Sequence, residues 1–152
     1  MGKKADLIKW GEEVIWFQPE EFEDPDHLGS WVHMEAETIY CLEGLRVQTG
    51  WPIITHNKYN LHGCVSVAEK GHTSNSRHYI SNACDAVDWH FDTDANARDQ
   101  ASIVLKSPFT GIGVYYDWNW DGKKLNIGFH TDLRSKHQYW NRKNGQYFYL
   151  LN

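Results

Sequence analysis

The stretch from Gly71 to Phe91 restricts the fold and the chemistry of this chain more than any other part of its sequence. It contains six side chains of the types that bind metal ions: His72, His78, Cys84, Asp85, Asp88 and His90. It ends in Ala86-Val-Asp-Trp-His-Phe91, where apolar and polar residues alternate as in a strand with one buried face. A second dense group, Gly128-Phe-His-Thr-Asp132, follows downstream. We therefore expect strands that carry a metal site on their polar face.

The length and composition predict one globular domain, residues 1–152. Hydrophobic residues make up 41% of the chain and charged residues 23%, which is ordinary for a soluble globular protein. The net charge of −5, without a long basic run, argues against a nucleic-acid partner. The sequence has no apolar run of about 18 residues, so we expect no membrane partner. It also lacks the apolar segment of a signal peptide, and we expect synthesis in the cytoplasm.

Cysteine and aromatic residues add two further expectations. The three cysteines form no CxxC motif, and we expect them to be reduced and mostly buried. Eight Trp and eight Tyr are many for a chain of 152 residues. They predict either a core of large rings or a groove lined by rings.

The order of the expected elements predicts an α+β fold. Helices are expected from Ser30, as N-cap, to Thr49, and from Asp94 to Lys106 with Asp92 or Thr93 as cap. Strands are expected at 110–116 and 125–133, pairing antiparallel. A closing hairpin is expected around Asn144-Gly145. This arrangement predicts a small antiparallel sheet that carries the site and packs against helices.

Four short motifs in this chain resemble those of a known family. They are Ser76-Arg-His78, an Ala-x-Asp, Gly111-Ile-Gly-Val-Tyr115 and Gly128-Phe-His-Thr-Asp132. Their order is similar to that of the M15 zinc peptidases, which include D-alanyl-D-alanine carboxypeptidases and phage L-alanyl-D-glutamate endolysins. The resemblance covers roughly residues 17–150. It implies an M15-like fold, a Zn²⁺ cofactor, hydrolysis of peptidoglycan stem peptides after release from the cell, and a phage or prophage origin.

The expected metal ligands are His78, His130 and one aspartate between them. Two neutral imidazoles and one carboxylate leave Zn²⁺ with net positive charge and a free coordination position. The middle ligand has two candidates. Spacing favours Asp85, which follows His78 by seven positions as in the family pattern. Strand alternation favours Asp88, because the residues that would then face the core are all apolar: Val87, Trp89 and Phe91. We predict Asp88, with Asp85 as the alternative.

Two residues are expected to assist catalysis. Asp132 lies two positions after His130 and is expected to orient its imidazole. His90 shares the strand face of Asp88 and is expected to line the cleft. The sequence departs from the family pattern at Ile127, where many relatives have an acidic general base. Asp117, Asp121 and His90 remain candidates for that role.

Substrate binding is expected from Ser76, Arg77 and Lys58. Ser76 and Arg77 follow the family motif and are candidates for holding a substrate carboxylate, although Arg77 suits a solvated surface role equally well. Lys58 takes the place of a family arginine. His72 is expected either beside a ligand or in solvent. Because a base is missing at Ile127, a catalytically impaired cell-wall or virion binding module is the alternative function.

Overall fold

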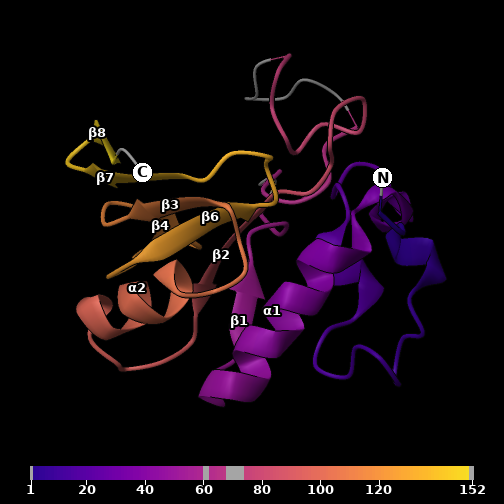
Figure 1. The fold of residues 1–152 in the computed structure, drawn as a ribbon, viewed down its shortest axis with the longest axis horizontal. Helices are drawn as coiled ribbons and strands as arrows, with labels where there is room; N and C mark the ends of the chain where they lie inside the picture. Colours follow the sequence, from indigo (N-terminus) through magenta and orange to yellow (C-terminus); the bar gives the residue numbers. More distant parts are fainter. Residues whose placement is uncertain (1, 60–61, 68–73, 151–152) are drawn as a thin grey trace.

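The computed structural model describes residues 2–59, 62–67 and 74–150, and these residues form an α+β fold (Figure 1). The helices are α1 (Ala36–Thr49) and α2 (Ala97–Leu105). The six-stranded sheet contains β1 (Ile53–Thr55), β2 (Val87–Phe91), β3 (Gly111–Tyr115), β6 (Gly128–Asp132), β7 (Gln138–Lys143) and β8 (Gln146–Leu150). A separate hairpin contains β4 (Asn119–Trp120) and β5 (Lys123–Lys124). Short 3₁₀ helices span Ala5–Leu7, Pro19–Phe22 and Ser30–His33. The predicted α+β class is confirmed.

The sheet has the order β1-β2-β6-β3-β7-β8 and is mixed. As predicted, β3 and β6 pair antiparallel, and β7 and β8 form the closing hairpin around Asn144 and Gly145. Both turn residues have positive φ, 52° and 76°, which suits a tight hairpin. The sheet is not wholly antiparallel, because β7 runs parallel to β3. The end of β6 and the start of β7 both lie beside Gly111, at the start of β3. A short connection around this end of β3 is therefore enough to place β7 parallel to β3.

Both helices begin later than the sequence predicted. Ser30 starts a 3₁₀ helix, and its hydroxyl accepts a hydrogen bond from the Asp24 amide at 2.8 Å. Helix α1 starts at Ala36, whose amide donates to the Lys3 carbonyl. Its predicted end is confirmed. Asn96, rather than Asp92 or Thr93, caps α2, because its side-chain oxygen accepts from the Asp99 amide at 2.9 Å.

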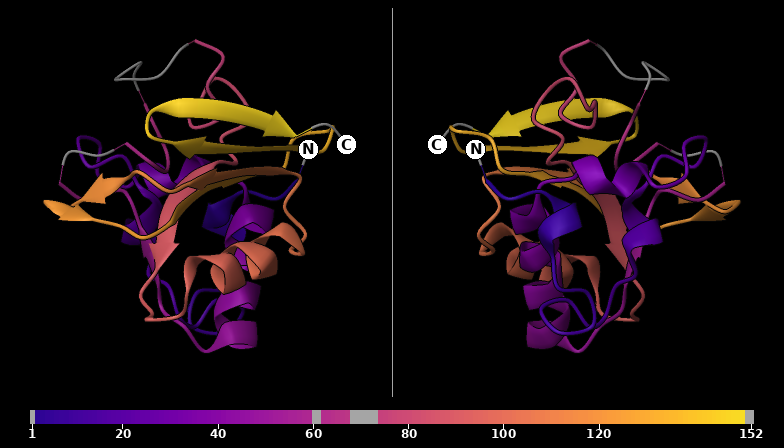
Figure 2. Two further views of the ribbon diagram at one scale, coloured as in Figure 1. Left: turned by 90° about the vertical axis from the view of Figure 1, so that its left-hand side faces the viewer. Right: turned by 90° about the vertical axis from the view of Figure 1, so that its right-hand side faces the viewer.

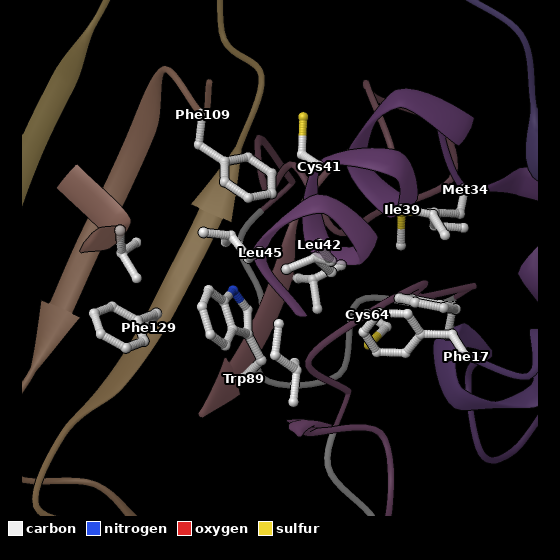
Figure 3. Packing of buried hydrophobic residues seen from close by; sticks show 14 of the residues in the cluster. Phe17, Met34, Ile39, Cys41, Leu42, Leu45, Cys64, Trp89, Phe109 and Phe129 are labelled. Atoms are coloured by element: carbon white, nitrogen blue, oxygen red, sulfur yellow. The ribbon is translucent and has the colours of Figure 1, made fainter. Parts of the chain in front are cut away.

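The hydrophobic core fills the space between the helices and one face of the sheet (Figures 2 and 3). Trp89 and Phe129, on neighbouring strands, pack with ring centroids 4.8 Å apart. The Trp89 indole N–H donates to the Thr131 hydroxyl at 2.9 Å, so its polar atom is satisfied inside the core. Leu42 and Leu45 of α1 belong to the same buried cluster (Figure 3). The opposite face of β2, β3 and β6 is therefore available for a polar site.

The cysteines are free and buried, as predicted. None of the helices in the described parts of the chain has the length and hydropathy needed to span a bilayer.

Two leucines provide a test of this core. Leu42 is fully buried, whereas Leu28 is 86% exposed. Leu42→Ala removes buried methyl groups and leaves a cavity, so we expect a loss of about 2–5 kcal/mol in the free energy of unfolding. Leu28→Ala should change it by less than about 0.5 kcal/mol. Urea unfolding followed by circular dichroism measures both, and equal effects would contradict the assigned core.

Candidate metal centre

The candidate metal centre lies on the polar face of the sheet, where β2 pairs with β6. Asp88 and His130 are direct cross-strand partners in this antiparallel pair, so their side chains point to the same side. His78 reaches the same place from the loop before β2. One ligand atom from each of His78, Asp88 and His130 lies within 4.8 Å of the others. The structure thus brings together the three residues predicted as ligands, with Asp88 as the carboxylate.

Backbone contact orients the His78 imidazole. Its Nδ1 lies 3.0 Å from the Cys64 carbonyl oxygen, which can only accept a hydrogen bond. We therefore place a proton on Nδ1, so that Nε2 is the atom available to a metal ion. Nε2 lies 3.5 Å from Asp88 Oδ1, on the side of the candidate ligands. Such an outer hydrogen bond sets the tautomer that a metal-ligating histidine needs.

A buried carboxylate orients the His130 imidazole in the same way. Its Nε2 lies 2.9 Å from Asp132 Oδ2, and its Nδ1 lies 2.8 Å from Asp88 Oδ1. Asp132 has no exposed surface and is also bound by the Arg134 guanidinium. With Nε2–H donating to Asp132, Nδ1 is the atom of His130 that faces the centre. This position agrees with the orienting role predicted for Asp132.

The close charges shift the pKa values of the group. Burial raises the pKa of Asp88, but His78 and His130 outweigh it and hold this pKa well below its ordinary value. Burial also raises the pKa of Asp132, but Arg134 and His130 hold it low. Burial lowers the pKa of His130, whereas Asp132 and Asp88 raise it to about 9. In the metal-free protein at pH 7, His130 is therefore an imidazolium between two carboxylates.

Two glycines on β3 make room for this arrangement. A Cβ atom on Gly111 would collide with the Asp132 carboxylate and the Arg134 guanidinium. A Cβ atom on Gly113 would lie 2.5 Å from the Trp140 indole nitrogen. The Gly-x-Gly motif therefore allows Asp132, Arg134 and Trp140 to lie flat against the strand beside the candidate ligands.

The three candidate ligands lie on the wall of a cavity of about 390 Å³. Its walls combine polar and aromatic side chains: Asn75, Ser76, Arg77, His78, Asp88, Tyr115, Trp118, His130, Arg134 and Trp140. Trp118 stacks on Tyr115 with centroids 4.1 Å apart and planes 6° apart. The Trp140 indole N–H donates to the Tyr115 hydroxyl at 3.0 Å. Aromatic rings thus line one side of the site. A groove lined by rings was one of the two arrangements that the high Trp and Tyr content predicted.

Asp85, the alternative ligand, has another partner in the structure. Its two oxygens accept from Arg77 Nε at 2.9 Å and Nη2 at 2.6 Å. It also accepts from the Leu133 amide at 3.2 Å. Asp85 precedes β2 and lies in a loop, so strand alternation does not apply to it. Arg77 lines the cavity, but its charge is directed at Asp85.

His90 does not line the cavity. It is buried, and its Nδ1 lies 2.8 Å from Nε2 of His56. The Trp120 ring covers this pair, with centroids 5.1 Å from His90 and 6.1 Å from His56. Burial lowers the pKa of each histidine to about 4, so both are neutral at pH 7. Two neutral imidazoles share one hydrogen bond here, a role for His56 that no motif in the sequence indicated.

Of the other described residues predicted for the site, Ser76 is the one that lines the cavity. Its hydroxyl accepts from the His78 amide at 3.3 Å. Lys58 is exposed and is not part of the cavity wall. His72 lies outside the described residues.

None of the acidic candidates for a general base lies on the cavity wall. Asp117 binds Arg142 and the Gly145 amide, and Asp121 lies exposed in the β4–β5 turn. Ile127 is buried in the core. Among the described cavity residues, the carboxylate present is that of Asp88.

A second group of metal-binding side chains lies apart from this cavity and contains Asp24, Asp26 and His62. Both Asp24 oxygens accept backbone N–H groups, from Asp26 at 2.9 Å and from Val67 at 2.9 Å. The first bond is local to one loop and the second connects it to the loop of Val67, so Asp24 has a structural role.

Comparisons with protein-family models, with curated proteins and with solved structures found no match to this chain. The functional assignment is therefore built on the geometry of the site and on the motifs.

Asparagine substitutions test which aspartate binds metal. Asp88→Asn removes the anionic oxygen between the two imidazoles, and we expect zinc affinity to fall by at least about 100-fold. Asp85→Asn weakens the pair with Arg77 and should change zinc affinity by less than about tenfold. Competition with a chromogenic chelator measures both values, and thermal melting checks that each variant folds. A larger loss in Asp85→Asn would contradict the assignment.

The raised pKa of His130 predicts that metal binding depends on pH. Below pH 9 the proton on His130 competes with the metal and must be released on binding. Apparent zinc affinity should therefore rise about tenfold per pH unit from pH 7 and level off near pH 9. Calorimetry in buffers of different ionisation enthalpy measures the released proton. An affinity that does not change with pH would show that His130 is already neutral.

Proposed function

We propose that this protein is a zinc-dependent peptidase that hydrolyses a peptide bond in peptidoglycan stem peptides. The observation that carries the proposal is the group His78, Asp88 and His130 at a cavity, with each imidazole oriented by an outer partner. The donor set fits Zn²⁺, which accepts imidazole nitrogen and carboxylate oxygen and keeps a position open in catalytic sites. The motif order supports the M15 type in particular.

The chain itself supplies binding and orientation in this proposal. A zinc ion held by these residues would polarise a peptide carbonyl and lower the pKa of bound water. Arg77 and Arg134 place guanidinium groups on the cavity wall, each paired with an aspartate, and guanidinium N–H groups suit a substrate with carboxylates. Both guanidiniums are fixed by buried aspartates, Asp85 and Asp132, so their positions are set before substrate arrives.

Tyr115 is the candidate donor to a developing oxyanion. Its hydroxyl accepts a hydrogen bond from the Trp140 indole, so its own proton points elsewhere. Burial raises the pKa of Tyr115 well above its ordinary value, so the hydroxyl keeps its proton at neutral pH. A protonated hydroxyl on the cavity wall beside the candidate ligands can stabilise negative charge on a carbonyl oxygen.

One observation favours a second candidate function, a metal-containing module that binds the cell wall without cutting it. The position where many M15 relatives have an acidic base holds Ile127, which is buried. A peptidase needs a group that takes a proton from water and delivers it to the leaving amine. In the described part of the cavity wall, no carboxylate other than that of Asp88 is present.

A pair of histidine variants tests the proposed function. His130→Ala removes a candidate ligand, and we expect loss of bound zinc together with at least about a 1,000-fold loss of peptide-bond cleavage. His137→Ala alters an exposed histidine beyond β6 and should change neither. Release of new amine termini from purified peptidoglycan measures cleavage, and mass spectrometry of the fragments identifies the bond. Wall binding by the wild type without amine release would favour the binding module.

A further inference from the structure

The aromatic wall of the cavity continues across the sheet to its open edge at β8. Gly113 pairs with His130 on one side and with Trp140 on the other, and Trp140 pairs with Tyr149. In the next row, Tyr115 pairs with Arg142, which pairs with Tyr147. Paired residues in neighbouring strands share a face of the sheet. Tyr147 and Tyr149 therefore lie on the same face as the candidate metal ligands.

The two tyrosines form an exposed aromatic platform. Their ring centroids are 6.4 Å apart and their planes differ by 19°, so they present two nearly parallel faces. Tyr147 is 49% exposed and Tyr149 is 61% exposed. Large rings exposed side by side often mark a binding surface.

Contacts beside the platform hold it in place. The Arg142 guanidinium lies 4.9 Å from the Tyr115 ring centroid and 5.7 Å from that of Tyr147. Asp117 accepts from Arg142 Nε at 2.8 Å and from the Gly145 amide in the β7–β8 turn at 2.7 Å. The hairpin is thereby attached to the loop that also carries the cavity residue Trp118. The platform and the cavity therefore lie on the same face of the sheet and are linked through Arg142 and Asp117.

We infer that Tyr147 and Tyr149 form a subsite for the glycan part of the substrate. This inference rests on the proposed function and adds a second point of recognition to it. A pyranose ring has apolar C–H faces that pack on aromatic rings, while its hydroxyls bond to phenol groups and amides at the rim. Strand β8 offers these groups and no charged side chain (Gln-Tyr-Phe-Tyr-Leu), and the Arg142 guanidinium beside Tyr147 is paired with Asp117. An uncharged sugar fits this composition better than a peptide with carboxylates.

The spacing also fits a substrate that has a peptide and a glycan. Strand β8 is three strands away from β6, about 14 Å at the usual strand separation. An extended peptide covers about 3.4 Å per residue, so about four residues span this distance. A peptide bond at the metal centre and the sugar that carries the peptide can therefore be bound at the same time.

Alanine variants of β8 test the subsite. The probes are a β-1,4-linked N-acetylglucosamine tetramer and a peptidoglycan stem peptide without sugar. We expect Tyr147→Ala and Tyr149→Ala each to weaken tetramer binding roughly tenfold, because each removes a stacking face. Tyr149→Phe keeps the ring and should bind within about threefold of the wild type. Isothermal titration calorimetry measures binding to the whole chain of 152 residues, and thermal melting confirms folding.

Phe148 and Leu150 provide matched controls, because they are 50% and 51% exposed and point to the opposite face of β8. Their alanine variants should bind the tetramer as the wild type does. The inference is overturned if the wild type does not bind the tetramer. It is also overturned if Phe148→Ala weakens binding as much as Tyr149→Ala, or if sedimentation shows a dimer that Phe148→Ala dissociates, since β8 would then pair with another chain.

These measurements separate the subsite from the proposed activity. Sugar binding is measured without cleavage, so a wild-type protein that binds the tetramer but releases no amine supports the subsite and contradicts the peptidase. A wild-type protein that cleaves the sugar-free peptide but does not bind the tetramer supports the peptidase and contradicts the subsite.

Discussion

The position of the His130 imidazole between two carboxylates is the interaction on which the rest of the site depends. The register of β2 against β6 places Asp88 directly opposite His130, and Asp132 follows on the same face of β6. Removing one partner from this partly buried group would leave the other charges uncompensated and so destabilise the fold. A shift of one residue in this register would turn these side chains into the core. The hydrophobic packing of Trp89 and Phe129 on the other face therefore also fixes the site.

Space on the polar face is as important as charge. The glycines of β3 have neighbours that leave no room for a Cβ atom, so the Asp132–Arg134 pair and the Trp140 ring lie directly on the strand. This close packing brings an ion pair and an aromatic wall to the same cavity. The same strand order carries the aromatic surface to β8, which connects the candidate centre with the platform at the sheet edge.

Several features of the site could be predicted from local sequence, because they follow from periodicity. Alternation of apolar residues around Asp88 identified the strand and its polar face, and the structure buries Val87 and Trp89 completely. Spacing had favoured Asp85, which is not in the group of side chains that the structure brings together. Asp85 lies in a loop and pairs with Arg77, a partner that spacing could not reveal. His90 shares the face of Asp88 as predicted, yet contact with His56 and Trp120 places it outside the cavity.

The sequence by itself determined the α+β class, the antiparallel pair of β3 and β6, the closing hairpin, and the set of side chains able to bind metal. These features depend on residues close together in the chain, or on one alternating pattern. Only the tertiary structure decided which aspartate faces the histidines, which nitrogen of each imidazole is directed at the centre, and that β7 runs parallel to β3. These features depend on contacts between distant segments, such as His78 with the Cys64 carbonyl, and no local pattern encodes such contacts.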